Sequence, residues 1–161
     1  MGSDKGSWHS YIDFYESFLA PHRLTTKKML EVGIKYGYSL LMWKDYFQNA
    51  EILGIDITCN NRLNPDDFTL IYADSRVPDA FEDIGNLDII IDDGSHRLRD
   101  QIATFNVFWP KMAPGGVYII EDVHRIEYAP KLTAMHSSAT VHDRRSIKGR
   151  TDDILVTFTK P

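Results

Sequence analysis

The sequence predicts a doubly wound α/β fold, in which helices cover both faces of a Rossmann-like, mostly parallel sheet. Two observations predict this class: short apolar runs alternate with helical patterns along the chain, and turn residues separate them. We find no internal repeat, low-complexity tract or Gly-, Ser- or Pro-rich linker in the 161 residues. We therefore expect a single domain over residues 1–161, with an N-terminal helical segment (1–24) packing on it.

The first half of the chain contains a helix, a strand, a second helix and a second strand. The first helix has five apolar residues at helical spacing, and Pro21 ends it; these residues are Tyr11, Phe14, Tyr15, Phe18 and Leu19. Residues 29–33 then read as a buried strand that opens into a glycine loop. Ser39 is expected to cap the next helix, whose Leu40, Trp43 and Phe47 share one face. Residues 51–56 form the second strand.

The second half continues the same alternation. Strands are expected at 69–73, at the apolar run 87–91 and at 117–120. A helix over about 99–112 presents Ile102, Phe105 and Trp109 to the sheet. Pro114-Gly115-Gly116 is expected to break the chain before the fifth strand. Residues 139–145 and 154–159 predict a closing antiparallel pair joined by a turn around Gly149.

Composition excludes several classes of protein. A formal net charge of −5 does not provide the clustered positive surface that nucleic acid needs, and no apolar run reaches the ~20 residues of a membrane span. The N-terminus does not read as a secretory signal. The single cysteine, Cys59, rules out an internal disulfide and a four-cysteine zinc site, and is interpreted as a bystander. One unpaired thiol predicts a reducing compartment, so we expect a cytoplasmic protein.

Acidic residues follow the predicted strands directly. They are Asp56, Asp74, Asp92, Asp93, Glu121 and Asp122. Ligands bind beyond the carboxyl ends of the strands in an open α/β sheet, so these side chains should converge on one rim. Asp also caps helices that follow strands, which explains one or two of them. Six acids, with two adjacent pairs, indicate a functional cluster.

The loop after the first strand predicts an adenosine-type ligand. It contains Gly33 and Gly37, but Lys35 stands where a dinucleotide fingerprint has its second glycine. Asp56 ends the second strand about 20 residues further on, where an acidic side chain hydrogen-bonds ribose hydroxyls. The missing glycine argues against NAD.

The segment Asp92-Asp93-Gly94-Ser95-His96 and the pair Glu121-Asp122 predict a metal site. Carboxylate oxygens on neighbouring strand ends suit Mg²⁺, which leaves room for substrate oxygens and lowers the pKa of a bound hydroxyl. His96 is placed to accept the proton, although a capping or core histidine is the alternative. His124 and His142 remain competing candidates for the base.

Several segments together resemble a known family, the class I S-adenosylmethionine-dependent methyltransferases. They are Gly2-Ser3-Asp4-Lys5-Gly6 with His9 and Tyr11, Leu30-Glu31-Val32-Gly33, Ser39-Leu40 with Trp43, Gly54-Ile55-Asp56-Ile57, Ile90 to His96, Pro114-Gly115-Gly116, and Tyr118 to Asp122. The closest resemblance is to metal-dependent sugar O-methyltransferases of macrolide biosynthesis.

The resemblance implies a seven-stranded sheet with a reversed closing strand, S-adenosyl-L-methionine as cofactor and Mg²⁺ as metal. It implies cofactor-binding residues Glu31, Gly33, Gly37, Ser39, Asp56, Asp74 and Asp92. Asp93, Glu121 and Asp122 would hold the metal, and His96 with Asp93 would be catalytic. The implied acceptor is a small hydroxylated molecule, a sugar or glycoside first. No membrane or nucleic-acid partner is implied, and a homo-oligomer is compatible with the sequence.

Three other functions fit parts of the sequence. An NAD(P)-dependent oxidoreductase would share the sheet, but the glycine loop and the absence of a Tyr-x-x-x-Lys pair argue against it. A non-catalytic cofactor-binding domain would have no use for crowded, unpaired acids. An RNA 2′-O-methyltransferase would require a more basic surface.

Overall fold

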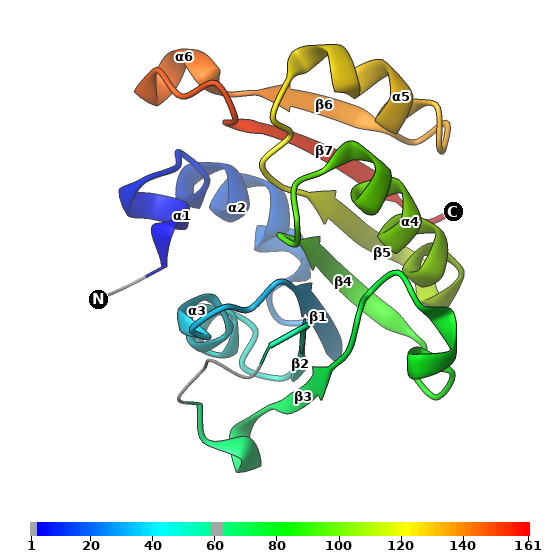
Figure 1. The fold of residues 1–161 in the computed structure, drawn as a ribbon. Coiled ribbons are helices and arrows are strands. Elements are labelled where there is room, and N and C mark those ends of the chain that lie inside the picture. The colour runs from blue at the N-terminus through cyan, green and yellow to red at the C-terminus, as the bar shows by residue number, and fades with distance from the viewer. Residues whose placement is uncertain (1–2, 59–62) are drawn as a thin grey trace.

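The computed structural model describes residues 3–58 and 63–161, and these residues contain a seven-stranded sheet (Figure 1). The strand order is β3-β2-β1-β4-β5-β7-β6. The strands are β1 (Lys28–Val32), β2 (Glu51–Asp56), β3 (Thr69–Tyr72), β4 (Leu87–Asp92), β5 (Met112–Ile120), β6 (Thr140–Asp143) and β7 (Ile154–Thr159). Strands β1 to β5 pair in parallel, while β7 is antiparallel to both β5 and β6. The predicted doubly wound sheet with a reversed closing strand is confirmed.

Helices cover both faces of the sheet (Figure 1). They are α1 (Asp4–Ser7), α2 (Ile12–Leu19), α3 (Tyr38–Tyr46), α4 (Leu98–Phe108), α5 (Ala129–Thr133) and α6 (Arg145–Lys148). Short 3₁₀ turns span Ala20–His22, Pro65–Asp67, Pro78–Phe81, Trp109–Lys111 and Ile126–Tyr128. Apolar residues of α2 and α3 form one core with the sheet, and those of α4 and α5 form the other.

Side chains alternate between these two cores along each strand. In β1, Met29 joins the α2/α3 core while Leu30 joins the α4 core. Ile119 and Ile120 of β5 divide in the same way. By the same alternation Glu31 and Glu121 point to the α2/α3 face. The acids at the strand ends are therefore divided between two faces of the sheet.

Two local predictions were wrong. Pro114-Gly115-Gly116 does not precede the fifth strand but lies within β5, where a bulge absorbs the extra residues: Leu87 pairs with Met112, whereas Ile89 pairs with Val117. Ser39 does not cap α3. Gly37, with φ of +81°, immediately precedes that helix, and Ser39 lies in its first turn.

The other boundaries shift by a few residues. The helix expected to reach residue 112 ends at Phe108, because Pro110 cannot continue it and a 3₁₀ turn follows. Cys59 lies outside the described residues. Among the described residues, none of the helices has the length and apolar character needed to cross a membrane.

Candidate active site

The carboxyl ends of the central strands meet at one edge of the sheet. Val32 pairs with both Ile55 and Asp92, and Asp92 pairs in turn with Ile120. The residues that follow these positions therefore share one rim. Parallel pairing thus places the glycine loop beside the acidic segments of β4 and β5, as the sequence predicts.

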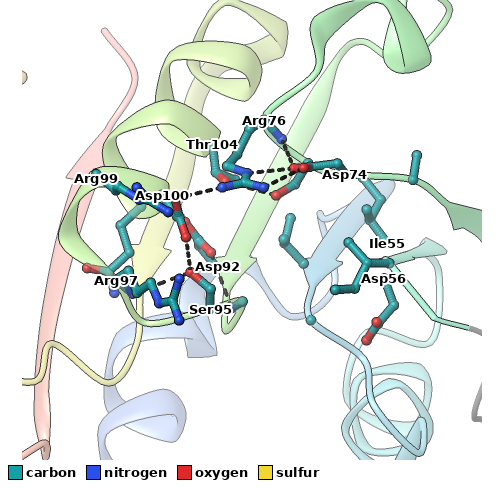
Figure 2. Close-up of a pocket in the computed structure, with 17 residues that line it drawn as sticks. Ile55, Asp56, Asp74, Arg76, Asp92, Ser95, Arg97, Arg99, Asp100 and Thr104 are labelled. Carbon is teal, nitrogen blue, oxygen red and sulfur yellow. Dashed lines mark hydrogen bonds and ion pairs between the residues drawn. The ribbon is translucent and has the colours of Figure 1, made fainter.

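Two adjoining cavities open at this rim. The first, of about 500 Å³, is lined by Asp56, Asp74, Asp92 and residues of α4 (Figure 2). The second, of about 410 Å³, is lined by Tyr36, Ser39, Asp93, His96 and Asp122, among others. Gly33, Asp56 and Gly94 line both. The cavities therefore meet at the glycine loop, and both have a size typical of small-molecule sites.

The glycine loop is held by Asp56. One carboxylate oxygen of Asp56 accepts hydrogen bonds from the backbone N–H groups of Ile34 and Lys35, at 3.0 and 2.8 Å. Gly33 has φ of +86°, and a Cβ there would lie 2.1 Å from the carbonyl oxygen of Asp93. Gly33 is thus required for the close approach of the loop after β4, a reason that the sequence alone did not give.

Glu31 lies behind the cavities rather than in their walls. It is completely buried, and its carboxylate accepts hydrogen bonds from the hydroxyl of Ser39 at 2.6 Å and the indole N–H of Trp43 at 3.2 Å. Ser39 itself lines the second cavity. Glu31 therefore orients the hydroxyl of Ser39, which forms part of the cavity wall.

Asp74 lines the first cavity but is already paired. Arg76 donates to both oxygens of Asp74, at 2.8 and 2.6 Å, and reaches Asp100 of α4 at 2.8 Å (Figure 2). These bonds hold the pKa of Asp74 at about 2. The salt bridges join the loop after β3 to α4 across the cavity.

Asp93, His96 and Asp122 converge in the second cavity. One ligand atom from each lies within 4.8 Å of the others. His96 Nε2 is 4.0 Å from Asp93 Oδ1. His96 and Asp122 have left-handed backbone, with φ of +58° and +51°, a conformation that non-glycine residues adopt at a cost. The backbone strain is therefore located where the two strand-end loops face each other.

His96 Nδ1 is buried and has no hydrogen-bond partner within the part of the chain that the structure describes. Buried polar atoms are normally paired, so the unpaired Nδ1 distinguishes His96 from a core histidine held by a hydrogen bond, and its other nitrogen, Nε2, lies nearer Asp93. The adjoining carboxylates offer hard oxygen donors, which a divalent cation prefers. These residues fit the predicted metal and acceptor site.

Glu121 is not part of that group. It is 1% exposed, lines neither cavity, and accepts hydrogen bonds from Tyr15 and, at 2.7 Å, from Lys5. Burial raises the pKa of Glu121, and Lys5 opposes the shift. Because side chains alternate along β5, Glu121 faces α2, whereas the next residue, Asp122, reaches the cavity.

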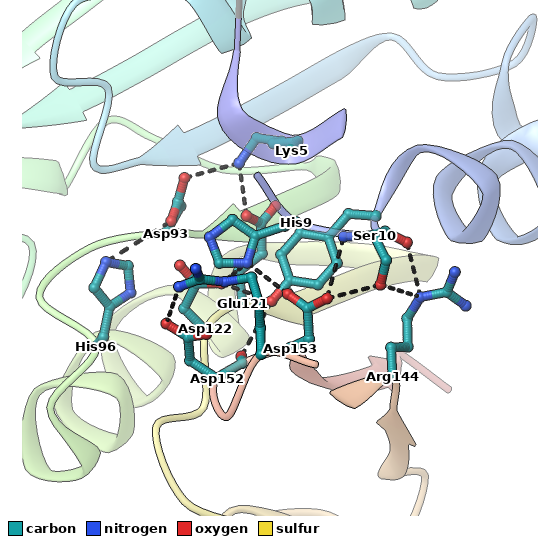
Figure 3. A network of polar contacts seen from close by, with 12 residues as sticks. Lys5, His9, Ser10, Asp93, His96, Glu121, Asp122, Arg144, Asp152 and Asp153 are labelled. Atoms are coloured by element: carbon teal, nitrogen blue, oxygen red, sulfur yellow. Dashed lines mark hydrogen bonds and ion pairs between the residues drawn. The ribbon is translucent and has the colours of Figure 1, made fainter. Parts of the chain in front are cut away.

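Lys5 is the residue that sequence reasoning missed. Although charged, it is 1% exposed, and its ammonium group lies 2.8 Å from Asp93 and 2.7 Å from Glu121 (Figure 3). It also lies 3.3 Å from Glu31. Burial acts to lower the pKa of Lys5, but the three carboxylates raise it well above its ordinary value. The sequence did contain one signal for such a residue: acidic side chains in apolar strands are buried, and buried carboxylates require a cation.

The N-terminal segment also supports Asp122. Tyr11 donates a hydrogen bond of 2.6 Å to Asp122 Oδ1, and His9 Nδ1 lies 3.5 Å from the same oxygen. His9 is anchored in turn by Asp153, at 2.6 Å. Segments from the two ends of the chain thus hold one side of the site (Figure 3).

The two competing histidines, His124 and His142, do not line either cavity. His142, on β6, packs against Phe14 and bonds Thr157 Oγ1 at 3.0 Å, and its pKa is lowered by burial and by Arg144. His124 is exposed, with its ring 5.6 Å from that of His96. Of the three histidines, His96 lines the cavity.

Comparison with known proteins identifies the family. A family model described as a methyltransferase domain matches residues 30–123, more than half of the chain. The chain therefore belongs to this methyltransferase domain family. The match includes the glycine loop, both cavity-lining acidic segments and the strands that carry them.

Two curated relatives are O-methyltransferases. The chain is 33% identical over 150 residues to 8-demethyl-8-alpha-L-rhamnosyl tetracenomycin-C 2'-O-methyltransferase of Streptomyces olivaceus, covering 86% of this chain and 39% of that protein. It is 32% identical to demethylmacrocin O-methyltransferase of Streptomyces fradiae, covering 73% of this chain and 33% of the relative. The chain thus spans about a third of the length of the relatives it matches.

A solved structure agrees with these relatives. The MycE methyltransferase of the mycinamycin pathway, in complex with Mg, SAH and mycinamycin VI, is 31% identical with a TM-score of 0.66, covering 71% of this chain and 33% of that one. A second MycE structure, with Mg and SAH, aligns over 95% of this chain and 50% of its own length at a TM-score of 0.75 and 23% identity, which supports the fold.

Comparing Gly33→Ala with Gly115→Ala should separate the cost of a positive φ from the cost of a steric clash. Gly115 has a similar φ of +78°, but a Cβ there meets nothing within 4 Å, so Gly115→Ala is a matched control. We expect Gly115→Ala to cost roughly 1 kcal/mol and Gly33→Ala clearly more, roughly 3 kcal/mol or above, because Asp93 must move. Urea unfolding measures both. Equal losses would contradict the close-approach argument.

Asp92→Asn should stabilise the protein increasingly as pH rises. Burial raises the pKa of Asp92 from 3.8 to about 7. Between these values the folded chain keeps a proton that the unfolded chain has lost, so the free energy of unfolding falls with increasing pH. We expect the variant to gain roughly 2–4 kcal/mol on the wild type between pH 4 and 8. Thermal unfolding in chelator measures this difference; a gap independent of pH would contradict it.

Proposed function

We propose that this chain is the catalytic domain of an S-adenosylmethionine-dependent O-methyltransferase that uses a divalent cation, Mg²⁺ first, to methylate a hydroxyl of a sugar or other small molecule. One observation carries the proposal: Asp93, His96 and Asp122 converge in a cavity that adjoins the glycine loop. The named relatives, which are sugar O-methyltransferases, support it.

In this proposal each cavity would bind a different end of the cofactor. The first cavity, with Asp56 and Asp74 in its wall, would take the adenosine end. Ribose hydroxyls would donate to Asp56 Oδ1 in place of the backbone N–H and hydroxyl of Thr58, which now donate to that oxygen at 3.0 and 3.1 Å. The second would take the sulfonium end and the acceptor. Gly33, Asp56 and Gly94 line both cavities, so the cofactor would run past these three residues.

When bound, the cofactor supplies an electrophilic methyl group, and the cation lowers the pKa of the acceptor hydroxyl. Asp93 and Asp122 would hold the cation. His96 accepts the hydroxyl proton at Nε2, the nitrogen on the Asp93 side. Tyr11 and Lys5 keep the two carboxylates in place. Fixed geometry and stabilisation of charge on the acceptor oxygen account for most of the acceleration.

Calorimetric titration tests the cofactor. S-adenosylmethionine and NAD⁺ are titrated separately into the protein, each with Mg²⁺ and with chelator. We expect micromolar binding of S-adenosylmethionine and none of NAD⁺, because Lys35 occupies the position at which a dinucleotide requires glycine. Binding of NAD⁺ alone would contradict the proposal, and silence of both ligands would favour a non-catalytic domain.

His96→Ala should reduce turnover without weakening cofactor binding. Loss of the general base is expected to lower turnover roughly 10²- to 10⁴-fold, while S-adenosylhomocysteine still binds, since its proposed contacts lie on the glycine loop and Asp56. Transfer of labelled methyl groups to a panel of sugars and glycosides measures turnover. The matched control is His124→Ala, because His124 is exposed beside the site. Unchanged turnover in His96→Ala would remove it from the mechanism.

A further inference from the structure

Lys5 occupies the position of a cation inside the acidic half of the site. It comes from the short helix α1, far from the strand ends in sequence, and its ammonium group contacts three carboxylates. Figure 3 shows two of them, Asp93 and Glu121. Glu31 lies within β1, Asp93 follows β4 and Glu121 follows β5. The N-terminal segment therefore places a positive charge among acidic side chains of the sheet.

One positive charge serves three carboxylates. Glu31 and Glu121 are 0% and 1% exposed, so water does not compensate their charges. Lys5 contacts both and opposes the rise that burial causes in the pKa of each. Because the ammonium group is fixed by three contacts, it is part of the built site rather than a mobile surface charge.

Asp93 is shared between Lys5 and the cavity. Its Oδ2 binds Lys5 at 2.8 Å, while its Oδ1 faces His96 at 4.0 Å, within the group that includes Asp122. A cation bound at Oδ1 would lie close to the ammonium group on the other oxygen of the same carboxylate. Two like charges that share one carboxylate repel each other, and the burial of the ammonium group limits screening by water on its side.

We propose that Lys5 is a resident counter-ion that lowers the affinity of the free site for Mg²⁺. This inference rests on the proposed function, in which Asp93 and Asp122 hold the cation. The acceptor would add oxygen ligands to those of Asp93 and Asp122, while the proton that it gives up stays on His96, so the net charge of the site does not change. The site therefore binds the cation weakly alone and more tightly together with the acceptor.

Lys5→Met tests this, with Lys148→Met as the matched control. Lys148 anchors the same N-terminal segment, donating to the carbonyl oxygens of Gly6 at 2.6 Å and His9 at 2.7 Å, but lies outside the acidic cluster. Mg²⁺ is titrated into the wild type and both variants with S-adenosylhomocysteine present, by calorimetry and by thermal unfolding.

Lys5→Met is expected to unfold at a lower temperature in chelator, to bind Mg²⁺ roughly tenfold more tightly than the wild type, and to gain more stability from Mg²⁺. Lys148→Met is expected to lose stability with wild-type affinity for Mg²⁺. A purely structural role for Lys5 would lower stability in chelator without tightening metal binding.

Unchanged or weaker Mg²⁺ binding by folded Lys5→Met would overturn the inference and leave the proposed function intact. A wild type that binds S-adenosylhomocysteine but no Mg²⁺ would overturn the metal part of the proposed function, and the inference with it. If Lys5→Met does not fold, Lys5→Met combined with Glu31→Gln removes one charge of each sign. That variant is expected to fold and to bind Mg²⁺ more tightly than the wild type; equal affinity would again overturn the inference.

Discussion

The contact between the Lys5 ammonium group and three buried carboxylates is the interaction on which the rest of the site depends. Glu31 and Glu121 end up in the α2/α3 core because side chains alternate along β1 and β5. Leaving either charge unpaired there would cost about 3–5 kcal/mol, judged from broken buried ion pairs elsewhere. Lys5 lowers that cost and at the same time fixes Asp93, so the stability of the core and the geometry of the cavity depend on one group.

Because of the same alternation, acidic residues adjacent in sequence face different sides of the sheet. Asp122 and Asp93 reach the second cavity, whereas Glu121, adjacent to Asp122 in sequence, supports them from behind. Asp92 faces the α4 core, where burial raises its pKa to about 7. The two members of each adjacent pair therefore face different surroundings: Asp92 lines the first cavity, Asp93 and Asp122 line the second, and Glu121 lies behind it. Lys5 and Tyr11 of the N-terminal segment fix Asp93 and Asp122.

Much of the fold was predictable from the sequence because apolar runs of the kind at 87–91 have few alternatives to a buried parallel strand. The convergence of acids on one rim followed from that topology. Three features were not predictable. Pro114 and Gly115 usually interrupt a strand, but here a bulge keeps them within β5. Gly33 is required by a backbone contact with Asp93, which is distant in sequence. Lys5 meets its carboxylate partners only in the folded chain. Each depends on long-range geometry that local pattern does not encode.

A crystal structure of the protein with S-adenosylhomocysteine and Mn²⁺, a substitute for Mg²⁺ with an anomalous signal, tests the central claim most directly. The account predicts the metal between Asp93 and Asp122, S-adenosylhomocysteine across both cavities, and Lys5 still bonded to Glu31 and Glu121. A metal bound at Glu31 and Glu121 with Lys5 displaced, or at His9, Asp152 and Asp153, which also lie close enough to hold an ion, would contradict it.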